Sequence, residues 1–175
     1  YARVWWPDLK ELLRKYGIPY SSYLIFNYNA KTNPPFTGGE FFVTEEPTAF
    51  AREILASGQE LALHGYNHVS LTREKTAMNY AAFPSRTAME QSLEMAKQEW
   101  VRLFGEHTLP YSYVAVNNII SEEGIEAVRK VFPSVRVIAL LRSGMGEETH
   151  TEFGPHPKYP ELYFIPRTTS GYPFT

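Results

Sequence analysis

Segments in which apolar residues recur at helical spacing alternate along the chain with short runs of apolar residues. Apolar residues recur every three or four positions in several segments, which is typical of amphipathic helices. The predicted helices cover residues 7–17, 44–58, 84–104 and 121–132, and the predicted buried strands cover residues 21–26, 60–63, 111–116, 135–141 and 162–167. Because helices and strands alternate, we predict an α/β fold with parallel strands and outer helices.

Polar residues follow the predicted strands at the points where the strands end. His64 and His68 follow one strand, and the asparagines Asn117 and Asn118 follow the next. In a parallel α/β barrel, reacting groups lie at the carboxyl ends of the strands. We therefore expect these side chains to share one cleft with Arg167, which ends the last predicted strand.

The pair of histidines carries the most specific chemical signal. The spacing of His64 and His68 predicts that both imidazoles point to the same side of one helical turn, and Gly65 allows the chain to turn sharply after the strand. Both rings can then reach one divalent metal at about 2.0–2.1 Å. The alternative is a pair of surface loop histidines without a metal, but their position at the mouth of a buried strand favours a metal site.

The other candidates each have two interpretations. Asn117 and Asn118 either line the cleft or form the turn before Ser121, which caps the next helix. Arg167 either reaches into the cleft, where it can orient a carboxylate, or is an ordinary surface arginine at a strand end. The residue pattern leaves these alternatives open.

Composition narrows the classes of function. The chain has 175 residues and a formal net charge of −2 without a basic run, so we predict neither a nucleic-acid partner nor binding to an anionic membrane surface. No apolar run reaches the roughly 18 residues of a membrane-spanning helix. The chain has no cysteine, which excludes disulfides and thiolate metal ligands. Its length predicts a single domain over residues 1–175.

The segment at residues 59–68 resembles the second motif of the polysaccharide deacetylases, the NodB-homology or carbohydrate esterase family 4 group. The sequence of this segment is nearer to that of the uncharacterised branches of the superfamily. The resemblance implies an irregular (β/α) barrel in which two histidines and one aspartate hold Zn²⁺ or another divalent transition metal. It also implies removal of acetyl groups from an acetylated polysaccharide or glycoconjugate, and an envelope or extracellular location.

Other motifs of that family are altered or missing. Residues 109–118 resemble the third motif, but Ala115 and Val116 stand where many relatives have prolines, and the usual arginine is absent. The first motif, an Asp-Asp pair on a strand, is expected before the first helix. Asp8 is the only aspartate and opens that helix instead. The last motif, a histidine acting as general acid, is expected beyond Tyr172. We therefore expect a barrel truncated at both ends, with the catalytic aspartate and histidine outside this chain.

Two hypotheses about function follow. The first is a metal-dependent hydrolase in which His64 and His68 bind the metal together with an upstream aspartate. The second is a catalytically inactive barrel that binds polysaccharide or a protein partner, which the altered third motif favours. Because barrels host unrelated functions, the fold alone does not choose between them.

Overall fold

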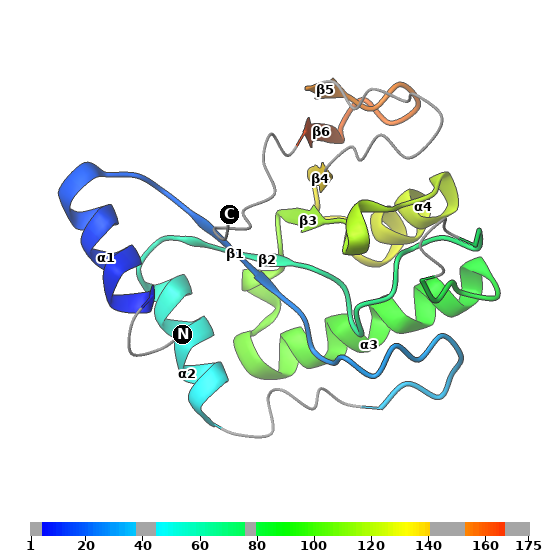
Figure 1. Ribbon diagram of the computed structural model, residues 1–175, viewed down its shortest axis with the longest axis horizontal. Coiled ribbons are helices and arrows are strands. Elements are labelled where there is room, and N and C mark those ends of the chain that lie inside the picture. The colour runs from blue at the N-terminus through cyan, green and yellow to red at the C-terminus, as the bar shows by residue number, and fades with distance from the viewer. Residues whose placement is uncertain (1–4, 38–44, 76–79, 141–152, 167–175) are drawn as a thin grey trace, which may run out of the picture.

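The computed structural model describes residues 5–37, 45–75, 80–140 and 153–166. A six-stranded sheet with the order β1-β2-β3-β4-β6-β5 forms its centre (Figure 1). The strands are β1 (Ser21–Leu24), β2 (Glu60–Leu63), β3 (Ser112–Val114), β4 (Val137–Leu140), β5 (Gly154–Pro155) and β6 (Tyr163–Pro166). Neighbouring strands are parallel except for β5 and β6. The predicted α/β fold with a mostly parallel sheet is confirmed.

Helices connect these strands. The α-helices are α1 (Trp5–Tyr16), α2 (Glu45–Ala56), α3 (Arg86–Phe104) and α4 (Glu122–Val131), and the short 3₁₀ helices are η2 (Glu106–Thr108) and η3 (Val116–Asn118). α3 and α4 lie side by side, and α2 packs along β2 (Figure 1). Within the described ranges, no helix has the length and apolar character needed to cross a membrane.

Capping residues set the limits of α3 and α4. The Ser85 hydroxyl accepts a hydrogen bond from the Ala88 N–H at 3.1 Å, and the Ser121 hydroxyl accepts one from the Gly124 N–H at 3.2 Å. α3 ends at Phe104, and the cap residue Gly105 has a φ of 87°, which is accessible to glycine at little cost. These contacts explain why the helix limits were predictable from the sequence.

The hydrophobic core includes side chains from the sheet and from α3. Met89 and Trp100 of α3 are fully buried in one cluster with Tyr113 of β3 and Ile138 of β4. Full burial of a large apolar side chain contributes about 1.5–3 kcal/mol. The indole N–H of Trp100 remains satisfied, because it donates to the Thr108 carbonyl oxygen at 3.1 Å.

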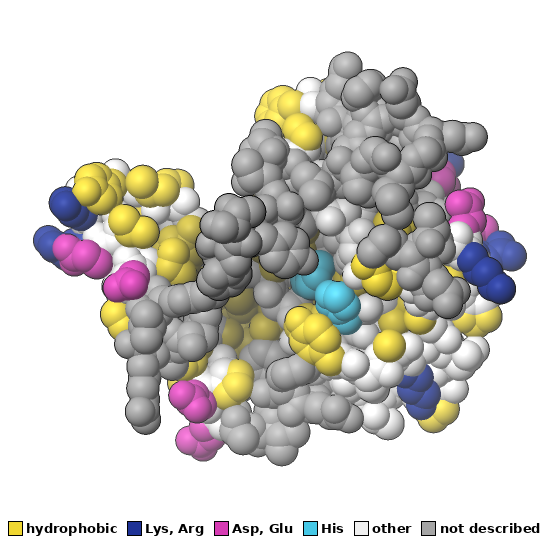
Figure 2. Space-filling model, viewed as in Figure 1, with side chains coloured by type: hydrophobic (Ala, Val, Ile, Leu, Met, Phe, Trp, Pro, Cys, Tyr) yellow, Lys and Arg dark blue, Asp and Glu magenta, His cyan; other side chains and the backbone are white. Residues whose placement is uncertain are grey.

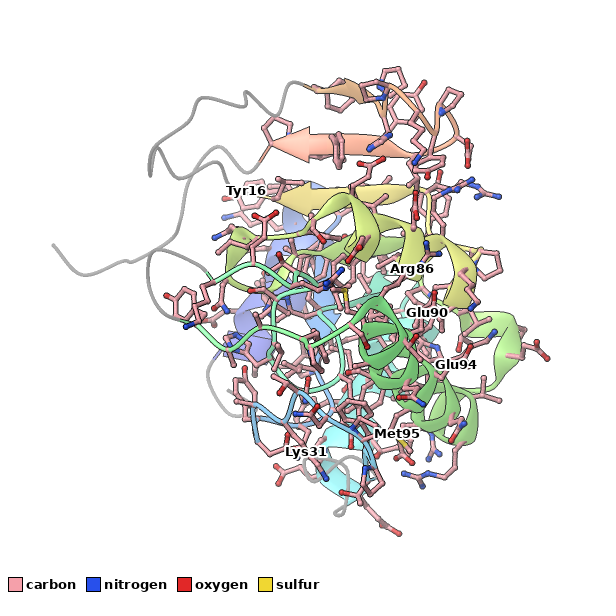
Figure 3. The ribbon with its side chains drawn as sticks, turned by 90° about the vertical axis from the view of Figure 1, so that its right-hand side faces the viewer. Tyr16, Lys31, Arg86, Glu90, Glu94 and Met95 are labelled. Atoms are coloured by element: carbon pink, nitrogen blue, oxygen red, sulfur yellow. The ribbon has the colours of Figure 1, made fainter. Side chains whose placement is uncertain are left out.

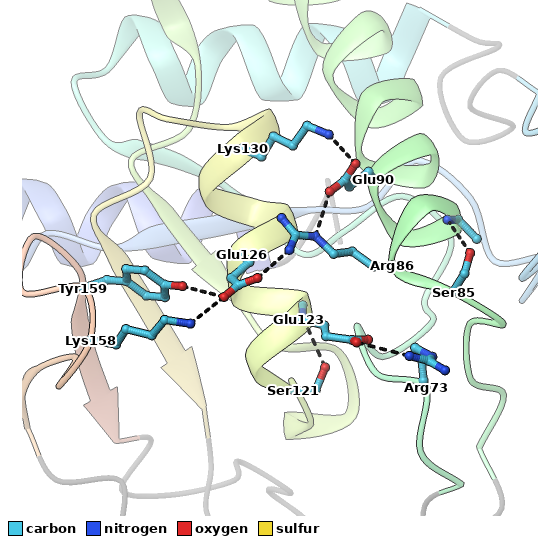
Figure 4. Close-up of polar contacts among 12 residues, drawn as sticks. Arg73, Ser85, Arg86, Glu90, Ser121, Glu123, Glu126, Lys130, Lys158 and Tyr159 are labelled. Atoms are coloured by element: carbon cyan, nitrogen blue, oxygen red, sulfur yellow. Dashed lines mark hydrogen bonds and ion pairs between the residues drawn. The ribbon is translucent and has the colours of Figure 1, made fainter.

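Ion pairs join α3 and α4 to the segment between β5 and β6. Arg86 and Glu90 lie on successive turns of α3 (Figure 3) and pair at 2.9 Å. Glu126 of α4 pairs with Arg86 at 2.5 Å and accepts hydrogen bonds from Lys158 at 2.7 Å and Tyr159 at 2.6 Å (Figure 4). These contacts, that from Lys158 foremost, lower the pKa of the Glu126 carboxyl to about 2.

Two details of the sheet differ from the prediction. β5 lies within residues 142–160, which the pattern predicts as loop, because a two-residue strand has no detectable period. The observed β1 and β3 are also shorter than predicted, because residues 25–26 and 115–116 already belong to the loops that leave the sheet. The loops that begin at these residues form part of the candidate site.

Candidate functional site

The carboxyl ends of β1, β2 and β3 lie next to one another at one edge of the sheet. β1 and β2 pair up to Leu24 and Leu63, and β3 pairs with β2 on its other side. The link between β1 and β2 continues beyond the strands. The His64 N–H donates to the Leu24 carbonyl oxygen at 2.8 Å, and the Phe26 N–H donates to the Tyr66 carbonyl oxygen at 3.1 Å. The loops that leave these strands therefore start together.

The backbone of the three exit loops adopts left-handed conformations. Among the described residues, the non-glycine residues with positive φ are Ala30 (51°), His68 (56°), Asn117 (53°) and Asn118 (59°). The first follows β1, the second follows β2, and the two asparagines follow β3. A left-handed conformation costs about 1–2 kcal/mol for most residues and less for asparagine. Backbone strain of this kind clusters at functional sites, and here it marks one sheet edge.

The orientation of the His64 ring is fixed by the backbone of β3. Its Nδ1 atom lies 2.9 Å from the carbonyl oxygen of Val114. A carbonyl oxygen only accepts hydrogen bonds, so Nδ1 carries the proton and the lone pair belongs to Nε2. Metal-binding histidines in proteins are held in the same way, with one ring nitrogen donating to a carbonyl or carboxylate.

His68 lies beside His64 and is covered on one side by an aromatic ring. The two imidazole centroids are 5.4 Å apart, and the phenol ring of Tyr28 stacks on His68 at 5.0 Å with an interplanar angle of 23°. Figure 2 shows histidine side chains gathered near the middle of this face, beside hydrophobic side chains. Partial burial lowers the pKa of His68, which favours the neutral imidazole that metals bind.

The predicted helical turn between the two histidines is wrong. Residues 64–65 are irregular and residues 66–68 form bends, and the next α-helix begins only at Arg86. Gly65 has a φ of 91° and His68 a φ of 56°, so neither can continue a right-handed turn. Tyr66 and Asn67, which lie between the two histidines in the sequence, are both buried. The two rings are therefore brought together by an irregular loop and not by the predicted helical spacing.

Side-chain hydrogen bonds hold this loop to both neighbouring exits. The Asn67 amide donates to the carbonyl oxygen of Lys31 in the loop after β1. The Asn117 amide donates to the Ser70 hydroxyl at 3.2 Å, and that hydroxyl donates to the Val116 carbonyl oxygen at 3.1 Å. Asn117 thus lies on the same edge as the histidines, where it fixes the segment that follows His68.

Gly65 packs against β3 and the segment that follows this strand. A Cβ atom at this position would lie 3.4 Å from Val116 Cγ2 and 3.8 Å from the Tyr113 hydroxyl. Burial raises the pKa of the Tyr113 phenol, and the backbone of Val116 opposes this rise. The hydroxyl has no hydrogen-bond partner of normal geometry in the described part of the chain. The loop with the two histidines therefore closes over a buried polar atom.

Two predicted site residues remain, Asn118 and Arg167. The Asn118 N–H donates to the Ala115 carbonyl oxygen at 3.0 Å and its backbone is left-handed, as the turn interpretation requires. Arg167 lies outside the described residues. Val114 and Tyr28 also contribute to the site and were not predicted from the sequence. A backbone carbonyl leaves no sequence signal, whereas Tyr28 stands between two asparagines at a strand exit, and this position could have identified it.

The two histidines fit a divalent transition metal only in part. Neutral imidazoles suit zinc, copper, iron and nickel. In the portions of the chain that are described, no group of three or more His, Cys, Asp or Glu side chains is placed to hold a metal ion. Zinc sites normally use three or four protein ligands. The described residues thus supply two donors, and a complete site needs at least one more.

Solved structures share this fold. A protein from Mycobacterium smegmatis, provisionally described as a polysaccharide deacetylase, superposes with a TM-score of 0.59 at 15% identity, over 93% of this chain and 45% of its own. A de-N-acetylase from Aggregatibacter actinomycetemcomitans superposes with a TM-score of 0.52 at 15% identity, over 82% of this chain and 60% of its own. At this identity the likeness shows a deacetylase-like α/β fold. The chain spans about half the length of these proteins.

The sequence also matches a protein family. The family model described as "Uncharacterised protein conserved in bacteria (DUF2194)" matches residues 1–174. None of the curated proteins matches the chain.

Proposed function

We propose that this chain, which belongs to the family of bacterial proteins described as DUF2194, contributes the histidine pair of a metal-dependent deacetylase site. The substrate would be an N- or O-acetylated carbohydrate. The observation that supports this most directly is the 5.4 Å separation of the His64 and His68 rings at the mouth of a parallel sheet. The deacetylase-like fold gives further support.

His64 and His68 would hold Zn²⁺ or another divalent transition metal. A metal bound there would polarise the acetyl carbonyl and lower the pKa of its bound water. The Val114 carbonyl sets the tautomer of His64, so that Nε2 is the nitrogen that binds. Burial lowers the pKa of His68, and this ring therefore also remains neutral near pH 7.

The remaining catalytic groups would come from outside the described residues. A carboxylate is needed as third ligand, and a general base and a general acid are needed to move protons to and from the reacting groups. Each acid or base is worth about 10²–10⁴-fold in rate. The resemblance assigns these roles to two aspartates and one histidine, none of which is found in the motifs of this chain.

A second candidate function is binding without catalysis. The described residues provide no third metal ligand, and Ala115 and Val116 replace the family's prolines at the exit of β3. A barrel of this kind would retain the groove at the carboxyl ends of its strands and bind polysaccharide or a protein partner there.

Acetate release distinguishes the two functions. The natural protein that contains this chain is stripped of metal, resupplied with Zn²⁺ and incubated with N-acetylated oligosaccharides. The enzyme hypothesis predicts zinc-dependent acetate release that His64→Ala and His68→Ala each abolish. His107→Ala, at an exposed histidine on η2, is the matched control. Oligosaccharide binding without acetate release under any metal would support the binding function and contradict the enzyme.

A further inference from the structure

The loop between β5 and β6, residues 156–162, is folded around a buried histidine. The side chain of His156 is only 7% exposed. Its ring stacks on that of Tyr159 with centroids 5.1 Å apart and an interplanar angle of 25°, and it contacts the Phe164 ring of β6 at 5.1 Å. The His156 N–H donates to the Leu162 carbonyl oxygen at 2.7 Å, which closes the loop. The fold of the loop therefore depends on the state of this ring.

Hydrogen bonds from the backbone fix the tautomer of His156. The N–H groups of Lys158 and Tyr159 both donate to its Nδ1 atom, at 3.1 and 3.2 Å. Nδ1 therefore carries a lone pair, and the ring proton of the neutral imidazole belongs to Nε2. Nε2 lies 3.3 Å from a carboxylate oxygen of Glu122 in the first turn of α4. The neutral form of the ring thus matches the two donors and the acceptor that face it.

The same loop is attached to α4 through charged groups. The titratable and charged side chains around His156 come from α4 and from the loop itself: Glu122, Glu126 and Arg129 of α4, and Lys158 and Tyr159 of the loop. Lys158 pairs with Glu126 at 2.7 Å, and the Tyr159 hydroxyl donates to Glu126 at 2.6 Å (Figure 4). Because Lys158 and Tyr159 also donate their N–H groups to His156, a rearrangement at the ring would alter these contacts with α4.

We infer that His156 is a proton-operated latch, which holds the loop of residues 156–162 against α4 while its ring is neutral. Protonation of Nδ1 turns the acceptor of two N–H groups into a donor that faces them. The N–H groups of Lys158 and Tyr159 then lose their acceptor, and the loop opens. Histidine is the side chain that ordinarily changes its charge between about pH 5 and 8. The latch is therefore closed at the upper end of this range and opens toward the lower end.

Glu122 opposes the opening, because its carboxylate attracts a protonated ring. The Glu122 side chain is 50% exposed, however, so water screens this attraction. The hydrogen bonds at Nδ1 are formed within the loop, beside the rings of Tyr159 and Phe164, where the His156 side chain has little contact with solvent. The loss at Nδ1 therefore outweighs the gain at Nε2, and the charged ring moves out toward water.

Hydrogen exchange of two backbone amides tests the latch. Protection factors of the Lys158 and Tyr159 amides are measured by NMR between pH 8 and pH 5, together with the ring signals of His156. Glu126 stays ionised over this range, because its pKa is about 2. One linked proton changes an opening equilibrium by up to about tenfold per pH unit. Both protection factors are therefore expected to fall by about tenfold or more, in step with protonation of the His156 ring.

His156→Asn is the matched variant. The oxygen of its side chain can accept hydrogen bonds from the same two N–H groups, as in an Asx turn, but it does not change its charge. Protection of the Lys158 and Tyr159 amides in this variant is expected to be independent of pH between 8 and 5. His107→Asn, at an exposed histidine of η2, is the control and is expected to behave like the unmodified protein.

Three outcomes would overturn the inference. The first is constant protection of both amides in the unmodified protein from pH 8 to pH 5, which needs no variant to be observed. The second is the same loss of protection in His156→Asn as in the unmodified protein. The third is a loss that extends equally to the amides of β2 and β3, because this would show unfolding of the whole sheet and not opening of one loop.

Discussion

Gly124 in the first turn of α4 lies directly against the carbonyl oxygen of Leu71. A Cβ atom at position 124 would be 2.2 Å from that oxygen, which is far inside van der Waals contact. The same oxygen accepts hydrogen bonds from the Ser121 N–H at 2.9 Å and hydroxyl at 3.1 Å. The start of α4 therefore packs on the segment that follows the histidine loop, and only glycine fits at the contact.

Gly124→Ala is expected to destabilise the protein substantially. Because the clash is with backbone, α4 or the Leu71 segment must move, and overpacking of this kind costs about 1–3 kcal/mol. The free energy of unfolding, measured by urea titration, checks the loss. Gly154→Ala is the control, because a Cβ there meets no atom within 4 Å. Equal stability of the two variants would contradict the packing at Leu71.

Tyr113→Phe is expected to preserve or raise stability. The buried Tyr113 hydroxyl has no partner of normal geometry within the described ranges, and a buried polar group without one costs about 1–3 kcal/mol. Tyr159→Phe provides the contrast, because it removes the 2.6 Å hydrogen bond to Glu126 and should destabilise. Thermal unfolding of both variants measures the difference. A marked loss of stability in Tyr113→Phe would mean that its hydroxyl is satisfied in solution.

Glu126 is expected to make the protein sensitive to acid. Its folded pKa of about 2 lies below the ordinary value of 4.5, so its stabilising contribution is present above pH 4.5 and is lost as the pH falls toward 2. Glu126→Gln should therefore flatten the decline of stability across this range. Glu94→Gln, at an exposed glutamate of α3 one turn after Glu90 (Figure 3), is the comparison. Identical acid profiles for unmodified protein and Glu126→Gln would contradict the ion-pair network.

Asn117 and Ser70 are expected to be energetically coupled. Asn117→Gly keeps the left-handed backbone but removes the amide that donates to the Ser70 hydroxyl. Ser70→Ala removes the partner. A double-mutant cycle on the free energy of unfolding should give a coupling of about 0.5–1.5 kcal/mol. Additive effects of the two substitutions would show that this bond does not hold the loop after His68.

Most of the fold was predictable because its signals are local. Gly105 marks the end of α3 and Ser121 caps the start of α4, and the apolar spacing within each helix predicts its buried face. Alternation of helices and strands then predicts the parallel sheet. β5 was missed because two residues carry no period, and its pairing with β6 depends on tertiary contacts.

The candidate site was predictable only in part. The proximity of His64 and His68 is confirmed, but the helical turn is wrong, because Gly65 and His68 adopt left-handed backbone in an irregular loop. The contacts that orient the rings could not be predicted. They come from Val114 at the end of β3 and from Tyr28 in the loop after β1, and the pairing of both strands with β2 decides which groups meet.

A zinc titration followed through the histidine side chains tests the central claim most directly. NMR signals of the imidazole nitrogens are recorded while Zn²⁺ is added to the protein, with His107 as internal reference. We predict that the Nε2 signal of His64 and a ring nitrogen signal of His68 shift together, and that His64→Ala removes the response of His68. Signals of His64 and His68 that respond separately, or no more than that of His107, would contradict a shared metal site.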